Sequence, residues 1–308
     1  MQTLVFDIET GAEPDDVLEG LFSFDESTVK NYRLLTTDFE PSEVKLGNMK
    51  DPAKIDAKIE TARLKFMTDK AAVTETIETA RSEAWQTFRD RAALSPLTGR
   101  VLAIGWWNLD TSNTFVAHVD GETEHLTENV LIENFLSMAD AVLSDGGSLV
   151  GHNIIGFDLP FLLRRGLKYG IRPPKTITNA LAQYRPTNLI DTMREWQFGN
   201  RYEGFVKLDQ LAAFFGTQRK TGDGADFHKK FFGTFDERQE ALAYCRNDVV
   251  MTAEIALKMR LIGNPVKQAA AQSKSQPEPS QPEPPQPEEP QPGHNAASTV
   301  AAQQDDIY

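Results

Sequence analysis

Two carboxylates stand one residue apart near the start of the chain, in the stretch LVFDIET (residues 4 to 10). The apolar run before them is typical of a buried strand, and side chains two apart on a strand point to the same face. Asp7 and Glu9 therefore direct two like charges at one spot beside a hydrophobic core, where unpaired burial is costly. A positively charged partner must neutralise them.

Two further acidic residues stand next to apolar runs. Asp158 lies where VGHNIIGFD passes from a strand to a helix, and Asp248 lies in YCRNDVV with Tyr244 four residues earlier on the same helix face. Taken alone, each has an ordinary explanation, as a helix cap or a solvated helix face. Their order along the chain, each beside an apolar run, favours one shared site.

Together, FDIET, GHNIIGFDLPFLLRR and YCRNDVVMT resemble the three motifs of DEDD superfamily 3′–5′ exonucleases, in the order found in the exonuclease domain of family B DNA polymerases and above all in its stand-alone relatives. The resemblance spans most of residues 1 to 260, including ALSPLTGRVLAIG, but covers 52 to 91 poorly. The third motif is of the Tyr type (DEDDy), because Ala243 stands where the His type has its histidine. The resemblance assigns the four family carboxylates to Asp7, Glu9, Asp158 and Asp248.

This resemblance implies a ribonuclease H-like α/β fold and metal-dependent 3′–5′ hydrolysis of single-stranded DNA, releasing nucleoside 5′-monophosphates. Oxygen-only ligands favour Mg²⁺ or Mn²⁺. Two such ions about 4 Å apart would clamp the attacking and leaving oxygens of the phosphodiester. Two alternatives stay open: an RNA-directed 3′–5′ exonuclease of the same fold, and a non-catalytic scaffold that binds nucleic acid or a replication protein.

The remaining site residues take supporting roles. A phenol has a pKa near 10, so we expect Tyr244 to orient the attacking water rather than to act as its base. By resemblance, Thr10, His152, Asn153 and Phe157 contact the strand end, although Phe157 could equally be a core residue. A basic run after the second motif could meet phosphates or form a solvated helix face. It comprises Arg164, Arg165, Lys168, Arg172 and Lys175.

The spacing of apolar residues predicts the elements that position these side chains. We expect strands at 4 to 9, 100 to 108, 114 to 120, 148 to 153 and 189 to 192, with helices between the later ones, which indicates a central mixed sheet flanked by helices. An apolar stripe over 52 to 91 predicts a long helical insertion within a catalytic domain of residues 1 to 265. We expect this stripe to pack on the catalytic domain, with Trp85 and Phe88 near the sheet; an arm that guides DNA or forms a dimer is the alternative.

Residues 266 to 308 are rich in Pro, Gln and Glu and predict a disordered tail. Its tip, DDIY, resembles the acidic tip of bacterial single-stranded DNA-binding proteins, so it could dock on a replication or repair protein; a merely solubilising tail is the plainer interpretation. The chain has one cysteine, no long apolar run and no secretory signal, which suits the cytoplasm and excludes a membrane partner. The net charge of −13 predicts modest affinity for DNA away from a metal-centred site.

Overall fold

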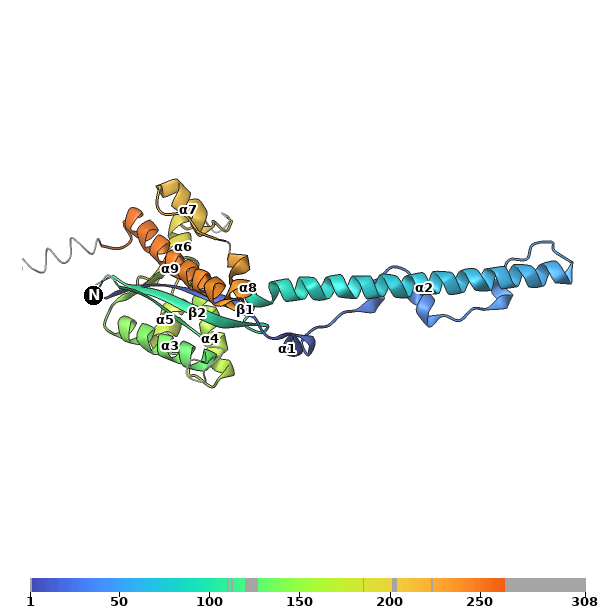
Figure 1. Ribbon diagram of the computed structural model, residues 1–308, viewed down its shortest axis with the longest axis horizontal. Helices are drawn as coiled ribbons and strands as arrows, with labels where there is room; N and C mark the ends of the chain where they lie inside the picture. The colour runs from blue at the N-terminus through green and yellow to red at the C-terminus, as the bar shows by residue number, and fades with distance from the viewer. Residues whose placement is uncertain are drawn as a thin grey trace, which may run out of the picture.

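A five-stranded mixed sheet forms the centre of the protein (Figure 1). The computed structural model describes residues 2–263 except 110, 112, 120–126, 185, 201–203 and 223. The strand order is β3-β2-β1-β4-β5. The strands are β1 (Thr3–Ala12), β2 (Gly99–Asn108), β3 (Asn113–His118), β4 (Ser148–Gly151) and β5 (Leu189–Asp191). Because β4 pairs in parallel with both β1 and β5, the carboxyl ends of these three strands point to the same edge of the sheet.

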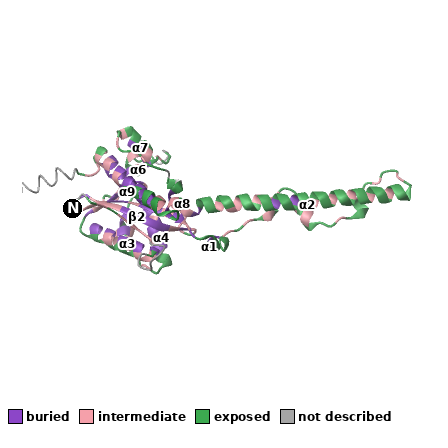
Figure 2. Cartoon of the chain, in the orientation of Figure 1, coloured by how far each residue is buried: buried purple, intermediate pink, exposed green. Residues whose placement is uncertain are grey.

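Helices cover both faces of the sheet, and the buried residues concentrate there (Figure 2). One face carries α3 (Glu128–Ser144), α4 (Asp158–Lys168) and α5 (Lys175–Ala182). The other carries α9 (Phe235–Lys258) and α8 (Phe227–Phe231), with α6 (Thr192–Trp196) and α7 (Leu208–Phe215) beside α9. These layers confirm the predicted ribonuclease H-like α/β fold class.

The alternation of side chains along β1 assigns its residues to the two layers. Phe6 and Ile8 pack into the core formed with α3 and α4, whereas Val5 packs with residues of α9. Asp7 and Glu9 share the parity of Val5 and therefore face α9. The helix crosses close to the sheet, because a Cβ added at Gly105 of β2 would lie 2.8 Å from the Val249 side chain.

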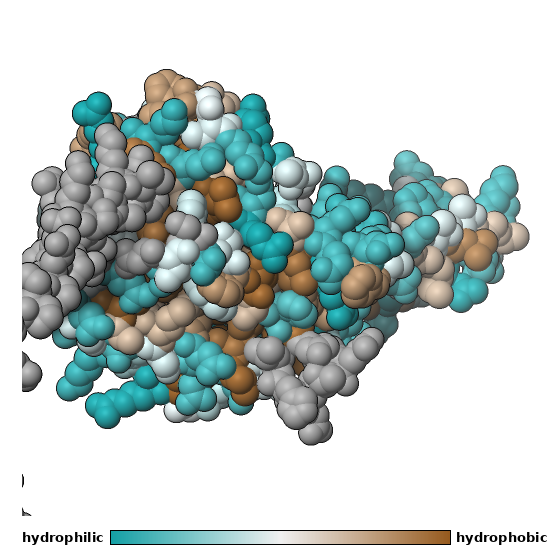
Figure 3. Space-filling model, turned by 60° about the vertical axis from the view of Figure 1, so that its left-hand side comes forward, coloured by the Kyte–Doolittle hydropathy of each residue, from teal (hydrophilic) through white to brown (hydrophobic). Residues whose placement is uncertain are grey.

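The helix α2 (Pro52–Arg91) has the predicted bounds but projects from the body of the protein as an arm (Figure 1). Its 40 residues span about 60 Å at 1.5 Å per residue. The short helix α1 (Asp15–Glu19) precedes it, followed by three 3-10 turns at Glu26–Thr28, Tyr32–Thr36 and Pro41–Glu43. The surface of the arm is largely hydrophilic in Figure 3.

The expectation that the apolar stripe of α2 packs on the catalytic domain is wrong. Trp85 and Phe88 both contact Phe22, at ring-centroid distances of 5.2 and 5.5 Å, and further out Phe66 contacts Phe39 at 5.7 Å. The partner of the stripe is therefore the chain's own segment 20–51, which runs beside the helix. The apolar stripe of α2 is narrow, so a single segment of chain is enough to bury it. Segment 20–51, which directly precedes the helix in the sequence, packs on it in this way.

Two further expectations concern the C-terminal tail and membrane-spanning segments. The tail at 266–308 and its tip lie outside the described residues. Within the described part of the chain, no helix has the length and apolar content needed to cross a membrane.

Candidate active site

Three of the four predicted carboxylates converge, although they come from distant parts of the sequence. Ligand oxygens of Asp7, Glu9 and Asp248 lie within 4.8 Å of one another. Asp7 and Glu9 come from β1, and Asp248 comes from the middle of α9, which packs on that face. Burial and then the neighbouring carboxylates raise the pKa of Asp7 well above its usual value, and burial followed by Asp248 does the same for the pKa of Glu9.

Asp158 lies beside this group at the first position of α4. Its side chain is 3% exposed, and its Oδ1 accepts a hydrogen bond of 3.2 Å from the backbone N–H of Ile8, between the two β1 carboxylates. Burial raises the pKa of Asp158 to about 7, against the opposing effect of that hydrogen bond. The fourth predicted carboxylate is thus attached to β1, within electrostatic reach of Asp7.

The cluster has the composition that a divalent cation requires. All its ligand atoms are carboxylate oxygens, which suit Mg²⁺ and Mn²⁺. Oδ1 of Asp248 is buried and has no hydrogen-bond partner among the described residues. Like charges that are held this close, with an acceptor left unsatisfied, fit the binding of a cation. Asp7, Glu9 and Asp248 could therefore hold a metal ion, with Asp158 adjacent.

Lys220 completes the site and was missed in the sequence. Its Nζ lies 2.5 Å from Oδ2 of Asp248 and donates a hydrogen bond of 2.6 Å to the Tyr244 hydroxyl. Burial opposes the charge on Lys220, but Asp248, Asp7 and Glu9 outweigh it and raise its pKa. A single lysine in the polar loop QRKTGDG carries no sequence signal of its own, so only the fold reveals its position.

Tyr244 stays protonated in this environment. Burial and the adjacent Asp248 and Glu9 raise the pKa of its phenol further above the ordinary value. The loop that follows Lys220 packs against the ring, because a Cβ at Gly222 would lie 3.5 Å from it. The hydroxyl can therefore donate a hydrogen bond, which agrees with an orienting role and not with a role as a base.

The substrate roles of the four residues expected to touch the strand end stay predictions. Thr10 donates its hydroxyl to the carbonyl of Ala93 at 2.8 Å. His152 has both ring nitrogens engaged, with Thr192 Oγ1 at 2.9 Å and the Val206 carbonyl at 2.8 Å. Its ring therefore braces two segments and offers no free nitrogen to a ligand.

Asn153 and Phe157 lie in the turn between β4 and α4. Asn153 has a left-handed backbone (φ 66°), which asparagine tolerates better than most residues. Phe157 is half-buried, and its ring lies 5.4 Å from that of Phe161 in the core. Its partial exposure is compatible with both interpretations made from the sequence.

A second buried acid, Asp191, holds this turn in place and was also missed. Its side chain is 1% exposed and accepts hydrogen bonds from backbone N–H groups of the turn after β4 and of α6. The donors are Asn153 at 2.9 Å, Ile155 at 3.1 Å, Met193 at 3.1 Å and Arg194 at 3.4 Å. Asp191 therefore positions the residues that lead to Asp158, and the sequence signal for it was a strand, LIDT, that ends in a helix-capping residue.

The basic run after the second motif does not act as one surface. Arg165 is 1% exposed, with its guanidinium 2.8 Å from Glu13 and 2.6 Å from Glu128, so the expectation that it meets phosphates or solvent is wrong. Lys168 lies 2.6 Å from Glu13 in the same network. These pairs connect the end of β1 with α3 and α4.

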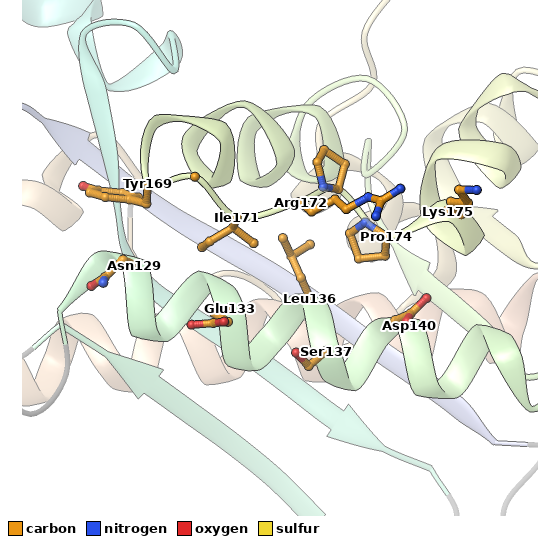
Figure 4. A pocket seen from close by; sticks show the side chains of 12 residues that line it. Asn129, Glu133, Leu136, Ser137, Asp140, Tyr169, Ile171, Arg172, Pro174 and Lys175 are labelled. Atoms are coloured by element: carbon orange, nitrogen blue, oxygen red, sulfur yellow. The ribbon is translucent and has the colours of Figure 1, made fainter.

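Arg172 and Lys175 line a pocket of about 680 Å³ between α3 and the loop after α4 (Figure 4). Asn129, Glu133 and Asp140 line its α3 side. None of the cluster's carboxylates borders this pocket, so it is separate from the candidate active site.

A mixed sheet that gathers carboxylates from β1, the start of α4 and the long helix α9 defines the class of ribonuclease H-like α/β proteins. Residues 94–277 match a family described as predicted 3′–5′ exonucleases related to the exonuclease domain of PolB. The match covers more than half of the chain, which therefore belongs to this family. No curated protein matches the sequence. The matched range includes Asp158, Tyr244 and Asp248 but begins after Asp7 and Glu9, which the structure brings to the same place.

Proposed function

We propose that this protein hydrolyses phosphodiester bonds from the 3′ end of single-stranded DNA, with two divalent ions, Mg²⁺ or Mn²⁺. The convergence of Asp7, Glu9 and Asp248 within 4.8 Å, with an unsatisfied buried oxygen on Asp248, is the observation that carries the proposal. Water adds to the terminal phosphorus and the P–O3′ bond breaks, which gives a nucleoside 5′-monophosphate and a strand with a new 3′-hydroxyl.

Each residue of the site has a part in this reaction. Asp7, Glu9, Asp248 and Asp158 would hold the ions, which supply a Lewis acid for the phosphate and activate water when bound. The protonated Tyr244 donates a hydrogen bond that orients the attacking water. Lys220 fixes Asp248 and the Tyr244 hydroxyl relative to each other. As the resemblance implies, we expect Thr10, Asn153 and Phe157 to contact the strand end.

The setting of the activity is part of the same proposal. The chain has a single cysteine, the buried Cys245, which agrees with a reducing cytoplasm. We place the enzyme in DNA replication or repair, with the C-terminal tip as a contact for a protein of that machinery. The tip can be tested separately with a labelled peptide, because its removal would leave hydrolysis of a naked oligomer unchanged.

The decisive experiment uses matched DNA and RNA oligomers, single- and double-stranded, labelled at the 5′ end. Mg²⁺ or Mn²⁺ should produce a ladder that shortens from the 3′ end of single-stranded DNA, and EDTA should abolish it. Asp7→Asn and Asp248→Asn should lose this activity, whereas Asp90→Asn, an exposed acid on α2, should retain it. Preferential cleavage of RNA would favour the alternative substrate, and wild-type activity in Asp7→Asn would refute the site.

A further inference from the structure

A cleft of about 690 Å³ opens at the edge of the sheet where β5 ends. Buried residues that border it are Ile155, Leu189 and Asp191. Ile155 belongs to the turn between β4 and Asp158, and Asp191 holds that turn. None of the four site carboxylates lines the cleft, but the turn that borders it leads directly into Asp158.

Phe198, which lines this cleft, combines an exposed side chain with an unfavourable backbone conformation. Its side chain is 91% exposed, and its backbone is left-handed, with a φ of 47°. This conformation is disfavoured for a bulky side chain, and backbone strain of this kind concentrates at ligand sites. Tyr184, 74% exposed, borders the same cleft. Two exposed aromatic rings around one hollow are what unpaired bases require for stacking.

Charge at the cleft is balanced rather than uniformly positive. Arg194 is exposed and lines the cleft, where its guanidinium could meet a phosphate. Glu195 also lines the cleft and opposes general anion binding. Stacking must therefore supply most of the affinity, with Arg194 adding one ionic contact.

We propose that this cleft binds the unpaired bases upstream of the scissile bond, which stack on Phe198 and Tyr184 while Arg194 meets a phosphate. The inference rests on the proposed function, because a 3′ end held at the carboxylate cluster is what brings upstream nucleotides past the turn between β4 and Asp158. An unpaired strand fits this cleft, since the faces of its bases are free to stack on protein rings. In a duplex those faces already stack on each other.

The test measures equilibrium binding of a fluorescent oligothymidylate to the full chain in EDTA, where no hydrolysis interferes. Phe198→Gly removes the ring and leaves a residue that accepts the left-handed backbone. Its Kd should rise about tenfold, the loss expected for one stacked base. Phe235→Ala, an exposed phenylalanine at the start of α9 outside the cleft, should bind like wild type. Arg194→Gln should reduce the slope of log K against log salt by about 0.7.

Two results would overturn the cleft assignment: failure of the wild-type chain to bind the oligomer, or equal Kd values for Phe198→Gly and wild type. The proposed function fails in a different way. If the protein binds the strand through Phe198 but does not shorten it with Mg²⁺ or Mn²⁺, the cleft assignment is supported and the proposed exonuclease activity is refuted. If the protein shortens the strand but Phe198→Gly leaves the Kd unchanged, the exonuclease activity is supported and the cleft assignment is refuted.

Discussion

Replacing Asp158 with asparagine should stabilise the metal-free protein, and by an amount that depends on pH. Asp158 is buried, and its pKa rises from 3.8 to about 7, mainly because of burial. Asparagine has the same shape, carries no charge, and keeps an oxygen that can accept the hydrogen bond from the Ile8 N–H. The substitution therefore removes the cost of burying the charge without removing the contact.

The magnitude follows from the pKa of Asp158 in the folded and the unfolded chain. A carboxyl group whose pKa is higher in the folded state favours folding at low pH, and this contribution is lost as pH rises through the folded value. Raising a pKa by one corresponds to about 1.4 kcal/mol, so the rise from 3.8 to about 7 costs wild type about 4 kcal/mol at about pH 8. Near pH 5 only the first part of this loss, about 2 kcal/mol, has occurred. The advantage of Asp158→Asn should therefore grow roughly two- to threefold between these pH values.

Urea denaturation in EDTA across this pH range measures the advantage directly. Glu133→Gln, an exposed acid on α3, serves as the control and should show a small difference that does not grow with pH. Added Mg²⁺ should stabilise wild type more than Asp158→Asn, because the variant lacks one ligand. The reasoning is refuted if Asp158→Asn is no more stable than wild type at about pH 8, or if its advantage does not change with pH.

Three further predictions follow from other contacts. Arg165→Met should lose about 3–5 kcal/mol in urea denaturation, because it leaves buried carboxylates unpaired, whereas exposed Arg164→Ala should stay within about 0.5 kcal/mol. Val73 is one of the two buried residues of α2, so Val73→Asp should release segment 20–51 from the helix, seen as faster proteolysis of that segment while the body unfolds at an unchanged urea concentration. Lys220→Met should move the acid limb of the pH–rate profile upward, because Lys220 opposes the burial that raises the pKa of Asp248; an unmoved limb would contradict this.

The parts of the site that the sequence predicted are those with a local pattern. Asp7 and Glu9 follow an apolar strand, and Asp248 lies one helical turn after Tyr244, so each pattern shows in a few residues. The structure brings three of the carboxylates together as this prediction required. Lys220 has no comparable pattern, and Asp191 has only that of a helix-capping residue at the end of a strand. Their roles depend on a loop and a strand end that reach the site only after the chain has folded.

The wrong prediction for Arg165 has the same origin. In the sequence it belongs to a basic run, and a run of charges is usually solvated. Its partners Glu13 and Glu128 lie 152 and 37 residues earlier, at places that carry no sign of a shared contact. Burial of a charge becomes favourable only when its partners are fixed around it. Pairing of this kind is a property of the assembled layers and not of any segment.

The arm lies between β1 and β2 in the sequence but does not displace the carboxylates of β1 from the candidate active site. The chain leaves the sheet after β1 and returns before β2, and both points are tied together: the Glu13 N–H donates to the Thr98 carbonyl at 2.9 Å, and Thr10 donates to the Ala93 carbonyl at 2.8 Å. Because exit and return are adjacent, the pairing of β1 with β2 extends to Ala12 opposite Gly99, with one register shift between Glu9 and Thr10. Asp7 and Glu9 thus keep their place beside Asp248, although the family match begins only at residue 94.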